Sequence, residues 1–322
     1  MIETNIKNTK ILKNILEGLY RKYNHKKFIP PDPLQFVYRY KDKADMEIAG
    51  FLAALFAYGA VEQIEKFLVV LLGKMGKSPA KFIKNLSAKD KKLFENLKYR
   101  FNTSQDIISL LEILKKVLVR YGSLEKLFLK GYSNSDKNII PAATKFIQSL
   151  DGKSSRGLKF LLAEPSSGGT SKRLFLFLRW MVRKDAVDAG LWEKIDKAKL
   201  VVPVDVHMGR LSKIIGLHNK KTVNLKTAIE ITAGFAEICP QDPVKYDFAL
   251  CRIGILENCT GRKNKYCPNC ELAEFCKKSC PVCTRAREKG EGFLYQFVKL
   301  EEGICPACRS YKKVYGKPAH EK

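Results

Sequence analysis

The stretch KRLFLFLRWMVR, residues 172–183, is apolar on nearly every side when it is wound into a helix. A helix with this pattern is buried, so the stretch predicts a central helix in a core made of other helices. Period-two alternation is nearly absent before residue 290, and the sequence therefore predicts an all-α fold. Helical spacing of apolar residues recurs on both sides of the stretch, at residues 11–19, 48–72 with a break near Tyr58-Gly59, 107–118 after an N-cap at Thr103 or Ser104, 207–215, 225–238 and 244–256.

The charge balance of the chain is strongly basic. Its 322 residues include 59 Lys and Arg against 33 Asp and Glu, a formal net charge of +26. Such a surplus favours a polyanionic partner, because every phosphate neutralised by Lys or Arg releases condensed counterions. A Lys-rich solubilising surface is the alternative, and composition alone leaves it open. A hydrophobic share of 45% excludes an intrinsically disordered chain.

The distribution of apolar residues predicts a cytoplasmic protein without a membrane partner, and the expected nucleic-acid partner adds association with the nucleoid. The longest apolar run, residues 48–58, is far shorter than the roughly 18–20 residues of a membrane span. The first twenty residues carry scattered charges and lack the apolar block of a signal peptide. Ten cysteines in a reducing compartment favour metal ligation over disulfides.

A first group of cysteines begins after Asn258, where the composition changes abruptly to Cys, Lys, Gly and Pro. Four thiolates in so short a loop can wrap a [4Fe–4S] cluster. The spacing is C-x7-C-x2-C-x5-C, formed by Cys259, Cys267, Cys270 and Cys276.

A second group consists of two C-P-x-C knuckles, Cys280-Pro-Val-Cys283 and Cys305-Pro-Ala-Cys308. The segment between them, residues 293–297, is aromatic and strand-like, and the whole pattern is typical of a zinc ribbon that binds Zn²⁺. A rival pairing joins Cys267 and Cys270 to the first knuckle in one zinc site and leaves four cysteines without a site. The predicted organisation is a helical domain over 1–258 with subdomain boundaries near residues 45 and 205, a cluster loop over 259–279 and a zinc-ribbon-like module over 280–322.

The cysteine loop and the segment VVPVDVHMGR, residues 201–210, resemble parts of the helix-hairpin-helix DNA glycosylases. The cluster loop of the endonuclease III group has six residues in the first gap, where this chain has seven. The family carries a P-V-D-x-H-x-x-R stretch whose Asp is catalytic, which maps to Asp205. Taken by itself, Asp205 is a good helix N-cap, and in this family both interpretations hold at once.

The resemblance implies two helical subdomains flanking a cleft. Bifunctional members of the superfamily use a Lys nucleophile at the start of the helix before the Asp, which maps to Lys172. The usual hairpin signature, L-P-G-V-G-x-K, is absent, since PSSGG stands at 165–169. The Lys–Asp gap of 33 residues is closer to the archaeal 8-oxoguanine glycosylase branch. The closest resemblance is to a family of uncharacterised microbial proteins, catalogued as a domain of unknown function, which shares the K-R-L-x-x-F-L-R-W-M-V-R and P-x-D-x-H-x-G-R runs.

Three cations share one face of the predicted helix at 172–183. At 100° per residue, Lys172, Arg179 and Arg183 lie within about 40° of one another. Cations on a buried helix need either acidic partners inside the protein or a cleft that phosphates visit. Both explanations remain open at this level.

The resemblance implies that damaged double-stranded DNA is bent and a nucleotide is flipped out. Lys172 would attack C1′ to release the base and form an imine, while Asp205 stabilises the sugar cation and helps deprotonate the lysine. Tyr58, at the end of AALFAYG, matches the residue that plugs the hole left by flipping, although a core tyrosine is equally plausible. The further DNA contacts expected are Gly168, Gly169, Thr170, Arg173, Arg179, Arg183, His207 and Arg210.

Three functions therefore compete. The first is a monomeric DNA glycosylase, with or without lyase activity, that needs no small-molecule cofactor beyond its metals. The second is a nucleic-acid-binding protein that keeps the fold and metals but has lost the chemistry. The third is an electron carrier built on the cluster, which leaves the cations of the 172–183 helix unexplained.

Overall fold

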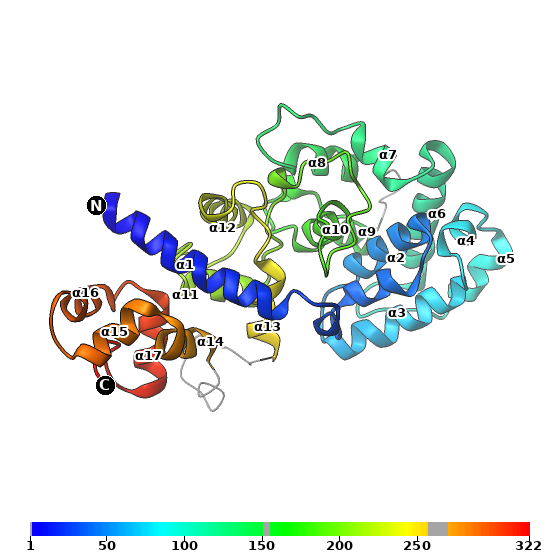
Figure 1. Cartoon of the computed structure of the whole chain (residues 1–322). Helices are drawn as coiled ribbons and strands as arrows, with labels where there is room; N and C mark the ends of the chain where they lie inside the picture. The colour runs from blue at the N-terminus through cyan, green and yellow to red at the C-terminus, as the bar shows by residue number, and fades with distance from the viewer. Residues whose placement is uncertain (1, 151–154, 257–269) are drawn as a thin grey trace. The chain divides into compact units, whose positions relative to one another are not determined.

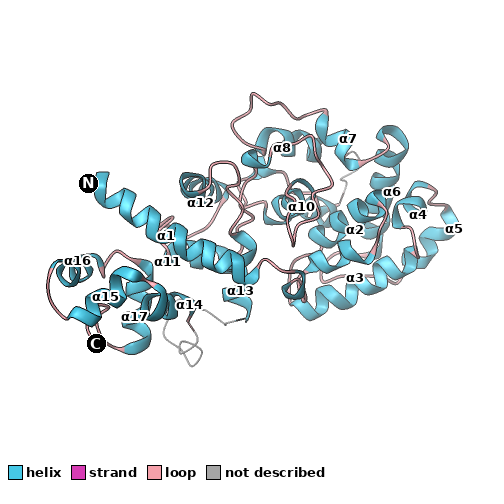
Figure 2. Cartoon of the chain, in the orientation of Figure 1, coloured by secondary structure: helices cyan, strands magenta, loops and turns pink. Residues whose placement is uncertain are grey.

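The computed structural model describes residues 2–150, 155–256 and 270–322. Figures 1 and 2 show that this part of the chain is built from helices. Within these residues there is no β-strand, only the isolated bridges Tyr99–Asn102 and Lys184–Ala189. The all-α prediction is confirmed for the described chain. None of its helices is both long enough and apolar enough to cross a membrane.

The chain divides into two compact units. Unit 1 contains Met1–Asn24, Val204–Val223 and Ile229–Lys322, and unit 2 contains His25–Pro203 and Asn224–Ala228. The breaks at 24/25 and 203/204 compare with the positions near 45 and 205 that the sequence suggested. Lys172 therefore belongs to unit 2 and Asp205 to unit 1.

Unit 2 is organised around the apolar stretch at 172–183. This stretch forms α10, in which every residue from Leu174 to Val182 is buried. Helix α10 packs against α2, where the rings of Phe51 and Phe177 meet edge to face with centroids 5.0 Å apart. The predicted break near Tyr58 is confirmed, since α2 ends at Leu55 and α3 begins at Val61. The α-helices of unit 2 are α2 (Lys43–Leu55), α3 (Val61–Met75), α4 (Pro79–Lys84), α5 (Ala88–Lys91), α6 (Ser104–Tyr121), α7 (Leu124–Leu129), α8 (Ile140–Gln148), α9 (Arg156–Leu161) and α10 (Lys172–Val182).

A buried carboxylate, Glu47, connects three segments of unit 2. It accepts hydrogen bonds from the backbone N–H groups of Leu124 and Glu125, both 2.9 Å long, and from Trp192 Nε1 at 2.8 Å. Burial raises the pKa of Glu47. The three donors satisfy both of its oxygens, and they link α2 to the start of α7 and to the indole of Trp192.

Unit 1 joins the N-terminal helix to the C-terminal third of the chain. The predicted stripe of α1 is confirmed, because Leu12, Ile15, Leu16 and Leu19 are buried. Glu17 on this helix receives hydrogen bonds from Lys245 Nζ at 2.6 Å and from the Tyr246 hydroxyl at 2.7 Å. The helices of unit 1 are α1 (Ile2–Tyr23), α11 (Val206–Ile214), most of α12 (Leu225–Ile238), α13 (Asp247–Leu256), α14 (Glu271–Glu274), a π-helical turn (Phe275–Ser279), α15 (Pro281–Lys289), α16 (Phe293–Glu301) and α17 (Pro306–Tyr315).

The zinc-ribbon prediction is wrong in its secondary structure. Residues 293–297, expected as a strand, begin α16, and both knuckles lead directly into helices, α15 and α17. Prolines 281 and 306 stand at the first helical position, where the fixed φ suits a helix and the missing N–H costs nothing. Each knuckle is therefore a helix start.

Candidate nucleic-acid interface and candidate metal centre

Lys172 is the first residue of α10 and follows an exposed glycine-rich loop. Gly168 has φ +86° and Ser171 has φ +50°, so the loop turns sharply before the helix. Gly168 and Gly169 are exposed, Thr170 is half-buried, and the Gly168 carbonyl accepts a hydrogen bond from Leu225 N at 3.3 Å. Ser171 makes no side-chain cap, so the first amides of α10 are not bonded by its hydroxyl.

The Lys172 amine lies beside the segment that leads to Tyr58. Its Nζ atom is 3.5 Å from the carbonyl oxygen of Ala57. No acidic side chain among the described residues forms an ion pair with this amine. The structure thus brings Lys172 next to Ala57, the residue before Tyr58, from a segment 115 residues away.

Tyr58 belongs to what we call the aromatic–cation cluster, in which three rings meet two guanidinium groups. The ring centroids of Tyr58 and Phe160 are 5.0 Å apart, and those of Phe101 and Phe160 are 4.6 Å apart. The Arg173 guanidinium lies 4.1 Å from the Phe160 ring, and that of Arg100 lies 5.9 Å from the Tyr58 ring. The cluster is partly open to solvent, since Phe101 is 54% exposed and Phe160 is 37% exposed.

Tyr58 itself is held within the cluster. Its hydroxyl donates to the Oδ1 atom of Asn102, and the Tyr99 hydroxyl donates to the Tyr58 carbonyl. Burial raises the pKa of Tyr58 to about 12, so the hydroxyl remains a donor at neutral pH. The tyrosine is half-buried and fixed, and Phe101 is the ring of the cluster that solvent reaches most.

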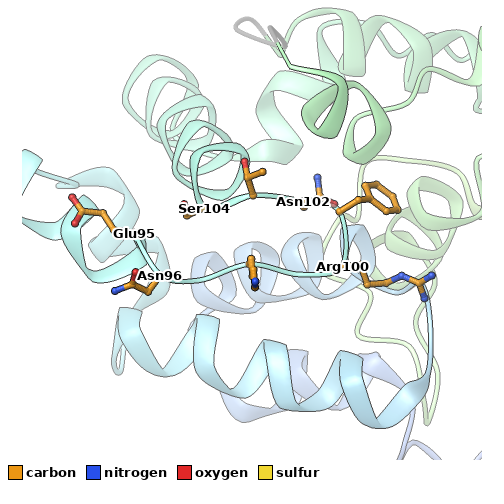
Figure 3. Close-up of a pocket in the computed structure, with 8 residues that line it drawn as sticks. Glu95, Asn96, Arg100, Asn102 and Ser104 are labelled. Carbon is orange, nitrogen blue, oxygen red and sulfur yellow. The ribbon is translucent and has the colours of Figure 1, made fainter.

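Phe101 sits on a tight turn whose geometry is strained. Backbone hydrogen bonds join Tyr99 and Asn102 in both directions, at 3.0 and 2.9 Å, so Arg100 and Phe101 form the tip. Arg100 has φ +53°, a region that costs a side chain other than glycine about 1 kcal/mol or more. Figure 3 shows Arg100 and Asn102 beside a pocket that extends to Glu95 and is also lined by Lys98. This turn is not among the predicted site elements, although the basic and aromatic run KYRF at 98–101 is a signal for it in the sequence.

Arg173 supports the aromatic–cation cluster by hydrogen bonds to two backbone carbonyls. Its Nη1 donates to the Leu55 carbonyl oxygen at 2.8 Å, and its Nη2 donates to the Phe160 carbonyl. Burial lowers the pKa of Arg173 to about 10. The guanidinium is thus committed to the C-terminus of α2 and to Phe160, while its flat face packs against the Phe160 ring.

The expectation that Arg179 and Arg183 contact DNA is corrected by their burial, which leaves them 2% and 3% exposed. Arg183 Nη1 lies 2.9 Å from Asp188 Oδ2 and also contacts Asp185, while Arg179 Nη2 lies 3.2 Å from Asp188 Oδ1. The internal acidic partners that the sequence left open are present. These two arginines hold α10 to the loop that follows it.

Asp205 begins α11 in unit 1. It is half-buried, and its Oδ1 accepts a hydrogen bond from Met208 N at 2.8 Å, which confirms the N-cap. His207 and Arg210 follow on the same helix and are half-buried. The Nδ1 atom of His207 is buried without a hydrogen-bond partner among the described residues. It lies against Gly254, and a Cβ atom added to this glycine would be only 2.6 Å from it.

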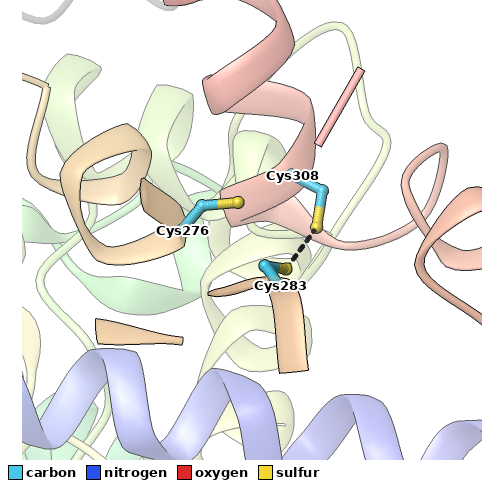
Figure 4. A group of neighbouring side chains, drawn as sticks. All are labelled: Cys276, Cys283 and Cys308. Carbon is cyan, nitrogen blue, oxygen red and sulfur yellow. Dashed lines mark hydrogen bonds between the residues drawn. The ribbon is translucent and has the colours of Figure 1, made fainter. Parts of the chain in front are cut away.

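Five cysteines of the C-terminal segment are buried, namely Cys276, Cys280, Cys283, Cys305 and Cys308. The Sγ atoms of Cys276, Cys283 and Cys308 all lie within 4.8 Å of one another, and Figure 4 shows them converging from three segments. Cys276, which the sequence assigns to the cluster loop, thus lies beside one cysteine of each knuckle. Cys259 and Cys267, predicted cluster ligands, lie outside the described residues, and Cys270 is half-buried.

The environment of Cys276 stabilises a thiolate. Thiol donors from Cys283 and Cys308, with help from Arg287, lower the pKa of Cys276 to about 4, and the Cys283 thiol lowers that of Cys280 to about 6. Arg287 Nη1 is 3.9 Å from Cys276 Sγ, and its Nη2 donates to the Cys276 carbonyl at 2.6 Å. Buried thiolates held in this way are typical ligands for a soft metal ion.

The chain belongs to the family described as "Protein of unknown function (DUF2400)", whose model matches residues 32–256. The match covers more than two thirds of the chain and ends before Cys259, so the eight C-terminal cysteines lie beyond it. No curated protein and no solved structure matches the chain. The kinship with helix-hairpin-helix glycosylases stays a prediction from Asp205 and the cysteine spacing.

Proposed function

We propose that this member of the DUF2400 family binds damaged DNA and removes a base from it, with Lys172 as nucleophile and Asp205 as the carboxylate that assists. The observation that supports the proposal best is the position of the Lys172 amine, 3.5 Å from Ala57 O and next to the aromatic–cation cluster. The cluster combines groups that attract a nucleic acid, since exposed rings stack on bases and the exposed guanidinium group of Arg100 adds a cation–π contact and can neutralise a phosphate.

The charge of the chain supports the choice of partner. A net charge of +26 attracts a polyanion, and the exposed, strained turn at Arg100 and Phe101 offers an aromatic side chain that can enter a base stack. Strain in a surface turn is common where the backbone is held for a function. The interface proposed in unit 2 therefore contains Phe101, Phe160 and Arg100 as well as Tyr58 and the exposed loop at Gly168.

The chemistry requires a neutral amine. Lys172 Nζ, after it loses a proton with the help of a carboxylate, forms a bond to C1′ while the glycosidic bond breaks and the base leaves. The secondary amine then opens the sugar to an imine. Lys172 has no acidic partner among the residues that the structure describes, and its amine is therefore available for this step. Asp205 uses one carboxylate oxygen as N-cap and keeps the other for charge on the sugar.

The metal part of the proposal keeps an iron–sulfur cluster and a zinc ion near the C-terminus. The cluster rests on the spacing of Cys259, Cys267 and Cys270, of which the first two lie outside the described residues. The zinc ion rests on the two knuckles. Both would be structural, holding the segment after α13.

Borohydride trapping tests the proposal. The purified chain is incubated with duplexes that carry oxidised, deaminated or abasic sites, and borohydride reduces any imine to a stable adduct. We expect an adduct with the native chain, none with Lys172→Ala, and a strongly reduced yield with Asp205→Asn. Lys84→Ala removes an exposed lysine of α4 and is the matched control, with unchanged yield expected.

The outcome separates the two main functions. Binding of duplexes without any adduct or base release across the substrate panel would overturn the enzyme and leave the non-catalytic nucleic-acid-binding protein. An adduct that persists in Lys172→Ala would overturn the choice of nucleophile. Absence of DNA binding at low salt would remove both functions.

A further inference from the structure

Five buried cysteines come from three short segments, and three of them converge on one centre. Cys276 comes from the π-helical turn, Cys280 and Cys283 from the first turn of α15, and Cys305 and Cys308 from the first turn of α17. None is more than 4% exposed. The two knuckles place their cysteines at equivalent positions, N-cap and N3, of helices that both begin at the centre.

The spacing of the sulfur atoms decides how many metal ions fit. A tetrahedral ion with metal–sulfur bonds of about 2.3 Å holds its sulfur atoms about 3.8 Å apart. Cys283 Sγ and Cys308 Sγ are 3.5 Å apart, and Cys276 Sγ completes a triangle with no side above 4.8 Å. In a four-iron cluster each cysteine thiolate binds a different iron atom. The distance between two iron atoms therefore adds to the separation of the cysteine sulfur atoms, which is larger than around a single ion. The triangle fits one ion and is too small for a cluster.

The surroundings are those of a closed structural site. Arg287 lies on α15, approaches Cys276 Sγ at 3.9 Å and donates to the carbonyls of Cys276, Lys277 and Ala319 at 2.6, 2.8 and 2.7 Å. Its guanidinium is 4.9 Å from the Tyr311 ring of α17. The Arg287 cation beside Cys276 Sγ and two helix N-termini offset the negative charge that four thiolates place around a divalent ion.

We infer that Cys276, Cys283 and Cys308 bind a single zinc-type ion, with the fourth thiolate supplied by one of the two N-cap cysteines, Cys280 or Cys305. Cys276 is then a ligand of this ion and not of the cluster predicted from the four-cysteine loop. The N-cap cysteine that does not bind the ion remains a buried thiol. Tetrahedral sites made only of sulfur and holding one ion suit Zn²⁺. The inference concerns the C-terminal segment beyond the family match and holds whether or not the chain acts on DNA.

The first test is the metal content of the full chain, purified without oxygen and assayed for zinc, iron and sulfide. We expect one zinc per chain that survives in Cys270→Ser and is lost in Cys276→Ser. Iron and sulfide that disappear in Cys276→Ser, with zinc retained, would overturn the inference, because Cys276 would then belong to a cluster.

The second test replaces zinc by cobalt, whose sulfur-to-metal charge-transfer band grows with the number of bound thiolates. We expect a weaker band, and cobalt affinity lowered more than about tenfold, in each of Cys276→Ser, Cys283→Ser and Cys308→Ser. Loss of a group that only orients a metal ligand already lowers metal affinity roughly 10- to 100-fold, and here the ligand itself is removed. Of Cys280→Ser and Cys305→Ser, one should behave as a ligand and the other like the control, Cys239→Ser. Cys239 is half-buried next to α12 and lies outside the centre.

A full four-thiolate spectrum in Cys276→Ser, lost in both Cys280→Ser and Cys305→Ser, would overturn the ligand set in favour of the two knuckles alone. Circular dichroism of each variant shows whether the remaining helices still fold. If the Cys276→Ser chain keeps its helical signal, a change in its cobalt titration is due to the lost ligand and not to unfolding.

Discussion

Asp188 receives Arg179 of α10 and Arg183, the residue directly after this helix, in a site that solvent does not reach. It is 1% exposed, and its two oxygens contact Arg179 and Arg183 at 3.2 and 2.9 Å. Removing one member of a buried charge group leaves the others uncompensated, so Asp188→Asn should lower the free energy of unfolding by roughly 3–5 kcal/mol. Urea unfolding followed by circular dichroism measures the change.

The control for this prediction is an ion pair on the surface. Lys66 and Glu62 on α3 are 2.6 Å apart, and both side chains are well exposed. Water and salt screen such a pair, so Glu62→Gln should leave the unfolding midpoint unchanged. Equal shifts in the two variants would contradict the role assigned to burial of Asp188.

Phe101 is the exposed ring at the tip of the strained turn. Its loss removes a stacking surface and little buried area, so Phe101→Ala should weaken DNA binding by roughly 1–3 kcal/mol without a change in thermal stability. Fluorescence anisotropy with a labelled duplex, repeated over a salt series, measures this. The salt dependence should stay the same, because a phenyl group carries no charge. Phe293 on α16, 77% exposed, supplies the control, and Phe293→Ala should bind like the native chain.

Helix α6 begins with a capping box that also fastens α9. The Thr103 hydroxyl accepts from Asp106 N at 3.2 Å, Asp106 Oδ2 accepts from Thr103 N at 2.8 Å, and the Ser155 hydroxyl donates to the other oxygen. Burial raises the pKa of Asp106, but these hydrogen bonds outweigh burial and leave the pKa below its ordinary value of 3.8. Asp106→Asn should therefore destabilise the fold by about 1 kcal/mol at neutral pH.

The sign of the pH effect follows from the lowered pKa. The ionised carboxylate stabilises the folded state above the ordinary pKa of 3.8, and this contribution is lost as the pH falls through the folded pKa. The native chain and Asp106→Asn should thus converge in stability on acidification, as thermal unfolding at several pH values shows. A difference that stays constant down to about pH 3 would rule out the carboxylate as its source.

Sequence patterns located the longest helices, because their signals are local, and left most of the short ones unpredicted. The cap at Thr103 and the apolar run before Arg183 each predict a helix without any tertiary contact. The helix at 293–301 was missed since aromatic residues favour strands, and here the stacked rings of Phe293 and Phe297, 6.3 Å apart one turn along, accompany a helix instead. Proline after the first cysteine of each knuckle was the overlooked signal for a helix start.

The candidate site was foreseeable only in part. A pattern placed Lys172 and Tyr58 among the site residues, but nothing in the linear sequence says that a lysine amine ends beside Ala57, 115 residues earlier. The acidic partners of Arg179 and Arg183 were likewise near in sequence but not identifiable, because pairing depends on the path of the loop after α10. The position of Cys276 beside the two knuckles also depends on tertiary structure and cannot be read from the cysteine spacing.

At the scale of the whole molecule, unit 2 and the C-terminal helices of unit 1 are stabilised by different means. Unit 2 has an apolar core around α10, in which Trp180, Phe177 and Phe51 are fully buried. The helices after residue 270 bury few large apolar side chains, among them Val298 on α16 and Tyr311 on α17. A segment of this size with so small a core needs a metal or disulfides to remain folded.

Metal removal should therefore act on one part of the chain only. Treatment with a zinc chelator under reducing conditions should release α14 to α17 and leave α2 to α10 folded, because binding free energy of a structural ion is folding free energy for the segment that holds it. Hydrogen exchange read by mass spectrometry should show fast exchange over residues 270–322 and unchanged protection over α6 and α10. Re-addition of zinc should restore protection in the native chain but not in Cys308→Ser. If chelation left the C-terminal helices protected, the five cysteines would be an ordinary apolar core, and if it exposed unit 2 as well, the two units would not be independently stable.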